Sequence, residues 1–229
     1  MVKFDKQGVD QAVFLLRQGK SVVFPTDTAY GLAVDATNIE AVRKLYLIKG
    51  RSFNKPVHVI VNSLKQAKKL ALFNSLAEKL FRKFLPGPLT LVLPLRPPFH
   101  LPLMRGRKRG GHRRKSEALS AIKLLSAGTG TLGVRMPKNR IALSLVRGLG
   151  RPITATSANI SGQPACYLVA EVTAQFEKSR IKPDLILDSN KLPRVKPSTV
   201  VDLTGQSVKI LRQGPISKKQ IFQTCAEKR

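Results

Sequence analysis

The chain has 229 residues, 42% of them hydrophobic, and is long enough to bury the core of one globular domain without requiring two. Its 41 Lys and Arg residues against 13 Asp and Glu give a formal net charge of +28, which favours polyanions such as nucleotides and nucleic acid as partners. Two cysteines without a CxxC pair indicate neither a disulfide framework nor a metal site, and no run approaches about 18 apolar residues, so we expect a cytoplasmic protein with no membrane partner.

A buried strand followed by a polar turn is the first feature that suggests a binding site. Apolar spacing predicts a helix over residues 9–18, and the β-branched run 21–24 predicts a strand that Pro25 ends. The hydroxyl-rich turn at residues 26–30 therefore leaves the carboxyl end of a buried strand. Turns at such places often carry binding groups.

A cluster of cations follows the next predicted helix. Residues 39–48 have helical apolar spacing, and Lys49 and Arg51 stand at the end of this helix, with Lys55 four residues further on. Fixed cations near a hydroxyl-rich turn suit an enzyme that holds a polyphosphate against a small polar substrate. We expect this cluster to be mobile enough to meet a ligand.

The rest of the chain continues to alternate between helices and strands. Apolar patterns predict strands at residues 57–61, 89–95, 131–136, 152–155, 185–187, 198–203 and 208–212. They predict helices at residues 64–72, 76–85, 141–149, 168–176 and 217–226. The last two strands are expected to form a hairpin. No repeat or linker divides the chain, so residues 1–229 are expected to form one domain.

The segment at residues 96–115 is the strongest break in composition. It holds eight Lys or Arg residues and no acidic one, which predicts a mobile basic loop within an insertion at about residues 97–128. Phe99 is its one aromatic residue, so the segment supports phosphate contact without sequence readout. A lid over a nucleotide and an arm that contacts RNA are both open interpretations.

Seven motifs occur in an order that resembles the YrdC-like threonylcarbamoyl-AMP synthases in their single-domain form. They are residues 25–32, the Lys49, Arg51 and Lys55 cluster, residues 86–90, 133–137, 157–159, 198–202 and 212–214. The resemblance covers about residues 9–222. It implies an α/β (α+β) fold with a large twisted mixed β-sheet flanked by helices and a concave basic cavity.

The resemblance also implies a reaction and its partners. L-threonine, bicarbonate and ATP would condense into threonylcarbamoyl-AMP and pyrophosphate, with Mg²⁺ carried by the nucleotide. A separate transferase partner would then move the threonylcarbamoyl group to the tRNA adenosine next to the anticodon. In this reaction a carbamate oxygen attacks the α-phosphorus, so the enzyme must neutralise the repulsion between two anionic reactants.

Candidate site residues follow from their positions within these motifs. The candidate catalytic residues are Lys49, Arg51 and Arg135. The candidate nucleotide-binding residues are Arg51, Lys55, Thr131, Ser157, Asn159 and Arg212. The candidate L-threonine-binding residues are Thr28, Arg135 and Ser198. Some family members carry a histidine where this chain has Ile60, and we assign no role to His58, His100 or His112.

The sequence alone also allows simpler interpretations of these residues. The Thr and Ser-Ala-Asn turns could only satisfy backbone groups, and the cations could be helix-end or solvated surface charges. The net charge would also suit a protein that binds double-stranded RNA or tRNA without turnover. A related branch of the same fold with another substrate is a third alternative.

Overall fold

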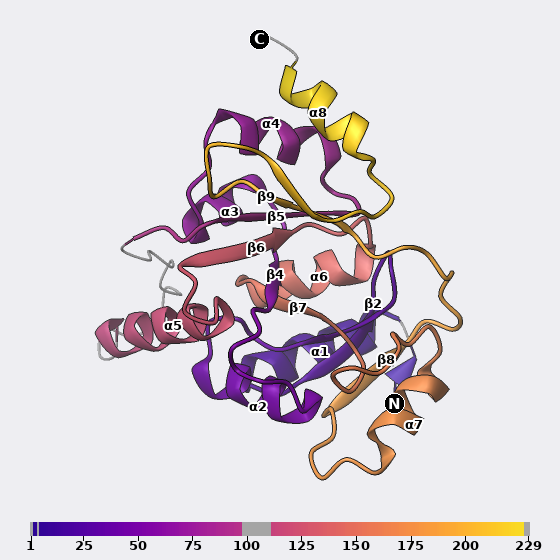
Figure 1. Cartoon of the computed structure of the whole chain (residues 1–229). Helices are drawn as coiled ribbons and strands as arrows, with labels where there is room; N and C mark the ends of the chain where they lie inside the picture. The colour runs from indigo at the N-terminus through magenta and orange to yellow at the C-terminus, as the bar shows by residue number, and fades with distance from the viewer. Residues whose placement is uncertain (1, 4, 98–110, 227–229) are drawn as a thin grey trace.

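The computed structural model describes residues 2–3, 5–97 and 111–226 (Figure 1). Its strands form one ten-stranded mixed sheet in the order β1-β8-β2-β3-β7-β4-β6-β5-β9-β10. The strands are β1 (Val2–Lys3), β2 (Val22–Pro25), β3 (Tyr30–Ala33), β4 (His58–Ile60), β5 (Leu89–Pro94), β6 (Thr131–Arg135), β7 (Ile153–Ser157), β8 (Leu185–Asp188), β9 (Thr199–Asp202) and β10 (Lys209–Arg212). The single mixed sheet agrees with the predicted fold class.

Helices cover both faces of this sheet. They are α1 (Lys6–Arg17), α2 (Ile39–Lys49), α3 (Leu64–Leu70), α4 (Ser75–Phe84), α5 (Gly111–Leu125), α6 (Arg140–Leu149), α7 (Val169–Glu177) and α8 (Lys218–Ala226). Asn38 and Asn139 cap the first turns of α2 and α6 through side-chain oxygens that accept backbone N–H bonds. Both helices end at a glycine in the left-handed conformation, Gly50 and Gly150, which lets the chain turn sharply.

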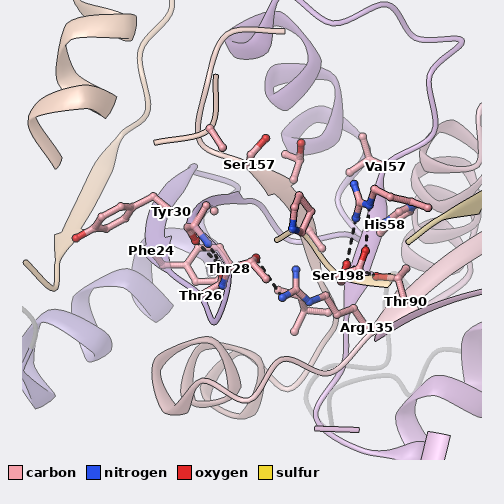
Figure 2. A pocket seen from close by; sticks show the side chains of 18 of the residues that line it. Phe24, Thr26, Thr28, Tyr30, Val57, His58, Thr90, Arg135, Ser157 and Ser198 are labelled. Carbon is pink, nitrogen blue, oxygen red and sulfur yellow. Dashed lines mark hydrogen bonds between the residues drawn. The ribbon is translucent and has the colours of Figure 1, made fainter. Parts of the chain in front are cut away.

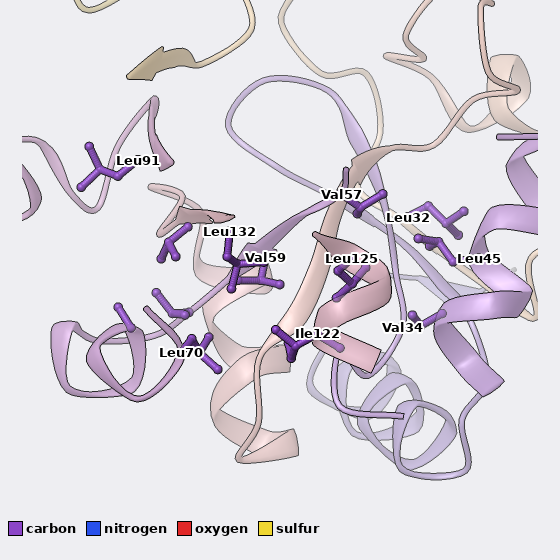
Figure 3. Close-up of a cluster of buried hydrophobic side chains, with 14 of the residues drawn as sticks. Leu32, Val34, Leu45, Val57, Val59, Leu70, Leu91, Ile122, Leu125 and Leu132 are labelled. Carbon is purple, nitrogen blue, oxygen red and sulfur yellow. The ribbon is translucent and has the colours of Figure 1, made fainter. Parts of the chain in front are cut away.

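Alternation along the strands separates two hydrophobic cores. Val59, Leu91 and Val134 belong to the larger core, to which α2 and α5 also contribute (Figure 3). Ile60, one residue further along β4, belongs to the smaller core beneath α1 and α6. Because successive side chains on a strand point to opposite faces, His58 and Ile60 share the second face. The cavity described below opens on that face.

Most predicted elements are confirmed to within two or three residues at their ends. The hairpin of β9 and β10 is antiparallel, as expected. The sequence analysis missed β3, which pairs antiparallel with β2 directly after the polar turn. It also missed β1, which is two residues long and pairs with β8 at the edge of the sheet.

The prediction of a basic loop up to about residue 128 is wrong for its second half. Helix α5 starts at Gly111, and its Ala118, Ala121, Ile122 and Leu125 are buried in the larger core. These four positions have helical spacing, and burying them stabilises the helix despite the charges at its start. Residues 98–110 of the predicted loop lie outside the described residues.

No helix in the described part of the chain is long and apolar enough to cross a membrane.

Candidate functional site

A cavity of about 300 Å³ lies on the same sheet face as α1 and α6, over the part of that face that these helices do not cover (Figure 2). The strands β2, β3, β4, β5, β6 and β7 supply its floor through Phe24, Gly31, His58, Ile60, Thr90, Arg135 and Ala155, among others. Arg51, Arg135 and Arg212 line it, and no acidic side chain does among the described residues. Three guanidinium groups around a hollow of this size make a site for an anion.

Arg135 is the most enclosed of the three arginines. Its side chain is 12% exposed and forms an ion pair with Asp27, and its Nη2 also donates to Thr28 Oγ1 at 3.2 Å. Burial lowers the pKa of Arg135, and the Asp27 carboxylate opposes this shift. The sequence analysis did not single out Asp27. Its position inside the polar turn was the available signal.

The polar turn between β2 and β3 is held by Thr26 and presents Thr28 to the cavity. Thr26 Oγ1 donates to the Ala29 carbonyl at 2.7 Å and accepts from the amides of Thr28 and Ala29. Thr26 therefore stabilises the turn, which is the simpler role that the sequence left possible for the threonines there. Both threonines line the cavity, but it is the Thr28 hydroxyl that accepts a hydrogen bond from Arg135.

Ser198 and Arg212 form the opposite wall. Ser198 precedes β9, and its hydroxyl lies 3.0 Å from Thr90 Oγ1 and accepts from Arg212 Nη2 at 3.1 Å. Arg212 Nε donates to the Ser198 carbonyl at 3.0 Å. Since the side chains of Ser198 and Arg212 are tied together, the hairpin of β9 and β10 fixes both at the cavity. Figure 2 shows Arg135 between Thr28 and Ser198.

Arg51 reaches the cavity from the segment that follows α2. Gly50 ends the helix with a φ of 55°, and the Arg51 amide then donates to the Tyr46 carbonyl at 2.9 Å. Its guanidinium donates to the Pro56 carbonyl at 3.0 Å and stays at the cavity wall. Arg51, which was predicted to bind the nucleotide, is thus positioned by the end of α2 and by the segment just before β4.

His58 is a cavity residue that the sequence analysis missed. Burial, with help from Arg212, Arg135 and Arg51, lowers its pKa to about 4, so the imidazole is neutral near pH 7. On the neighbouring strand β6, a Cβ at Gly133 would collide with the imidazole ring. The period-two pattern of β4, which puts His58 on the same face as Ile60, was the signal that could have found it.

Lys49 does not line the cavity, although it was predicted to be a mobile catalytic cation. Its side chain is buried, and its Nζ donates to the Ser157 carbonyl at 2.5 Å, the Asn159 carbonyl at 2.8 Å and Asn159 Oδ1 at 2.9 Å. Burial lowers the pKa of Lys49 to about 7, with the nearby Arg51 charge as a second cause. Helical periodicity explains why Lys49 is buried and not mobile as expected, because it lies on the buried face of α2 with Leu45 and Tyr46.

The predicted nucleotide-binding residues divide between the cavity and its surroundings. Ser157 lines the cavity, and its hydroxyl donates to Asn159 Oδ1 at 2.6 Å. Asn159 is buried behind it and holds the turn through Lys49 and the Gln163 carbonyl. Lys55 is exposed outside the cavity lining, and Thr131 stands at the other end of β6 from Arg135. The geometry therefore brings together Arg51, Ser157 and Arg212 but not Lys55, Thr131 or Asn159.

Sequence comparison places this geometry within a known family. The Sua5/yciO/yrdC family model, which is described as telomere recombination, matches residues 14–214. The chain belongs to the Sua5/YciO/YrdC family. The seven motifs that suggested this resemblance all lie inside or at the edge of the matched range.

Relatives within the Sua5/YciO/YrdC family share both the sequence and the fold. The threonylcarbamoyl-AMP synthase of Pyrococcus abyssi is 35% identical over 217 residues, which is 94% of this chain and 56% of the relative. That of Klebsiella pneumoniae is 30% identical over 91% of this chain and 96% of its own. A solved structure, P. abyssi Sua5 complexed with L-threonine, is 32% identical with a TM-score of 0.82, and the match covers 100% of this chain and 61% of that one. The chain thus spans little more than half the length of its P. abyssi relative.

Proposed function

We propose that this protein condenses L-threonine, bicarbonate and ATP into threonylcarbamoyl-AMP and pyrophosphate. The observation that carries the proposal is the convergence of Arg51, Arg135 and Arg212 on one cavity. Membership of the family, and relatives that are named threonylcarbamoyl-AMP synthase, support this reaction over passive RNA binding. The enzyme would belong to the nucleotidyltransferases.

The cavity offers a separate place for each reactant. Arg135, Thr28 and Ser198 are proposed to hold L-threonine, because a planar guanidinium binds a carboxylate in a bidentate manner and the two hydroxyls flank it. Arg51, Ser157 and Arg212 are proposed to hold the nucleotide phosphates at the other walls. Lys49 and Asn159 would act from behind by fixing the Ser157 turn.

Catalysis in this arrangement rests on electrostatics and positioning. The threonine amine first takes up bicarbonate with loss of water and forms a carbamate. A carbamate oxygen then attacks the α-phosphorus of ATP, and the bond from this phosphorus to the pyrophosphate oxygen breaks. Both reactants are anions, so the arginines stabilise the transition state by offsetting their repulsion in a partly enclosed site.

Magnesium would have to arrive with the nucleotide. No group of three His, Cys, Asp or Glu residues in the described ranges could hold a metal ion, and the cavity lining there lacks a carboxylate. Mg²⁺ prefers oxygen ligands and is often held largely by substrate phosphates. The chain's own contribution is therefore its arginines and hydroxyls.

The product defines further partners. A transferase that receives threonylcarbamoyl-AMP and modifies the tRNA adenosine next to the anticodon is proposed to act after this enzyme, in the cytoplasm. The net charge of +28 supports contact with tRNA or another RNA. The relatives' names support the adenylate but do not identify the partner.

The test is a synthesis assay with purified protein, ATP, Mg²⁺, L-threonine and labelled bicarbonate. The protein should release pyrophosphate only when threonine is present and should form a labelled adenylate. Arg51→Ala and Arg135→Ala should each lower kcat/KM by about a hundredfold or more, since each removes a charge that faces the reactants. Arg43→Ala is the matched control, because Arg43 is an exposed arginine on α2 paired only with Glu40 among the described residues.

Three results would contradict the proposal. Pyrophosphate release that does not depend on threonine would indicate another substrate, as in a related branch of the fold. Full activity in both arginine variants would remove Arg51 and Arg135 from the reaction. RNA binding without any turnover would favour the non-enzymatic alternative.

A further inference from the structure

Asp27 forms an ion pair with Arg135, one of the three arginines that line the cavity. Its side chain is 13% exposed and accepts from Arg135 Nη2 through Oδ1, while Oδ2 accepts from the Lys138 amide at 3.3 Å. Asp27 itself does not line the cavity, whereas its neighbour Thr28 and its partner Arg135 do. The carboxylate thus joins the turn between β2 and β3 to the start of the loop after β6.

Arg135 uses only part of its hydrogen-bonding capacity. Its Nη2 serves both Asp27 and Thr28, its Nε is buried without a partner, and no hydrogen bond joins its Nη1 to a described residue. A guanidinium carries five N–H donors in a fixed plane. Because Nη2 is held by Asp27 and Thr28, these two contacts restrict the directions in which the remaining donors can point.

We propose that Asp27 is a positioning residue that orients Arg135 and Thr28 together so that the cavity recognises the carboxylate of an amino acid substrate. This inference deepens the proposed function and rests on it. Three observations carry it: the shared Nη2 contact of Asp27 and Thr28, the bridge from Asp27 to Lys138, and the unpaired donors of Arg135.

Loss of Asp27 is expected to affect the binding of L-threonine and not that of ATP. Without Asp27 the Arg135 side chain loses the partner that fixes its plane, and the turn that carries Thr28 loses its link to the loop after β6. A displacement of about 1 Å in a positioning group is enough to reduce a rate severely. Arg51, Ser157 and Arg212 form no hydrogen bond or ion pair with Asp27 and are held by other described residues. Loss of Asp27 should therefore weaken the binding of L-threonine but not that of ATP.

The experiment measures L-threonine binding by calorimetry without ATP, and KM for each substrate during adenylate synthesis. Asp27→Ala should raise both the Kd and the KM of L-threonine by about tenfold or more, with the KM of ATP changed less than about threefold. Asp27→Asn keeps the size and the acceptor atom but loses the charge, and should give a smaller change in the same direction. Asp27→Glu should recover part of the lost affinity because it restores the charge.

Asp35→Asn is the matched control. The buried Asp35 forms an ion pair with the partly exposed Arg151 at 2.7 Å, and neither residue lines the cavity. It should lower the melting temperature without altering threonine affinity. Circular dichroism on every variant separates loss of fold from loss of binding.

The possible outcomes test the role of Asp27 separately from the proposed synthesis of threonylcarbamoyl-AMP. Unchanged threonine affinity in Asp27→Ala and Asp27→Asn overturns the role of Asp27 and leaves the proposed function intact. Equal losses for threonine and ATP also overturn it, since they mean a purely structural ion pair. If the unaltered protein binds threonine but makes no adenylate, the proposed function fails while the binding comparison still tests Asp27. If it binds no threonine at all, both are overturned.

Discussion

His58 is a neutral residue between three arginines, and its position has a consequence for stability. Its pKa is lowered to about 4, from 6.5, by burial and by the charges of Arg212, Arg135 and Arg51. As the pH falls below about 6.5, the unfolded chain binds a proton at this residue and the folded chain does not. The folded state therefore loses stability between about pH 6.5 and pH 4.

Replacing His58 should remove this pH dependence. We expect His58→Asn to reduce the loss of stability between pH 6.5 and pH 4 by roughly 1 to 3 kcal/mol, because Asn does not titrate there. Denaturant unfolding at several pH values measures the difference between the two proteins. If the free energy of unfolding falls equally with pH in the original and His58→Asn proteins, His58 does not cause the loss of stability.

The contact between His58 and Gly133 explains why a small residue is needed on β6 at this point. A side chain at Gly133 would meet the imidazole ring, so the sheet can place a histidine at the cavity floor only if the adjacent strand leaves room. The motif Gly133-Val134-Arg135 thus has two functions. It opens space for His58 and delivers Arg135 two residues later on the same face of the strand.

Helix α5 connects the basic segment to the core, and its stability depends on a narrow apolar stripe. Ile122 is fully buried, and Figure 3 shows it beside Leu125 in the larger core. Ile122→Ala should lower the free energy of unfolding by about 2 to 5 kcal/mol, because it removes buried methyl groups and leaves a cavity. Leu119→Ala on the same helix should cost less than about 1 kcal/mol, since Leu119 is 37% exposed. Urea unfolding of both variants tests the difference, and equal costs would mean that the helix does not pack as described.

Local sequence patterns identified most helices and strands, but they missed β3 and α5, whose formation depends on packing against the rest of the fold. Strand β5 is a nearly continuous apolar run and was predicted well. The strand β3 was missed because its tyrosine and glycine follow a turn without a clear alternating pattern. Helix α5 was missed because the positive charges at its start masked the apolar stripe behind them.

The sequence motifs predicted which segments contribute to the site, but they did not predict which side chains of a motif point into the cavity. Arg51, Arg135, Ser157, Ser198, Arg212 and Thr28 line the cavity as expected. Lys49 and Asn159 belong to the same motifs but bind each other behind the wall, because the helix phase of α2 and the turn after β7 decide their direction. Asp27 was overlooked because its importance depends on Arg135, which lies 108 positions away in the sequence.

At the scale of the whole molecule, the cavity lies near one end of β5 and the basic segment follows the other end in the sequence. Strand β5 runs from Thr90 at the cavity to Pro94, and the basic segment at residues 96–115 begins just beyond the Pro94 end. At about 3.3 Å per residue, these two ends of β5 are roughly 13 Å apart. The segment therefore begins well away from the three arginines that line the cavity.

The last prediction separates a localised RNA contact from diffuse attraction. Replacing Arg105, Arg107, Lys108 and Arg109 together by Gln should weaken tRNA binding and reduce the slope of log affinity against log salt by roughly 1 to 3, since each lost phosphate contact contributes just under one unit. The matched control replaces four exposed cations elsewhere, Lys178, Arg180, Lys182 and Lys191, and removes the same charge. Filter binding over a salt series measures both, and threonine-dependent pyrophosphate release should be retained in both. Because counterion release counts contacts and not total charge, equal slopes for the two variants would mean that the basic segment makes no special contact with RNA.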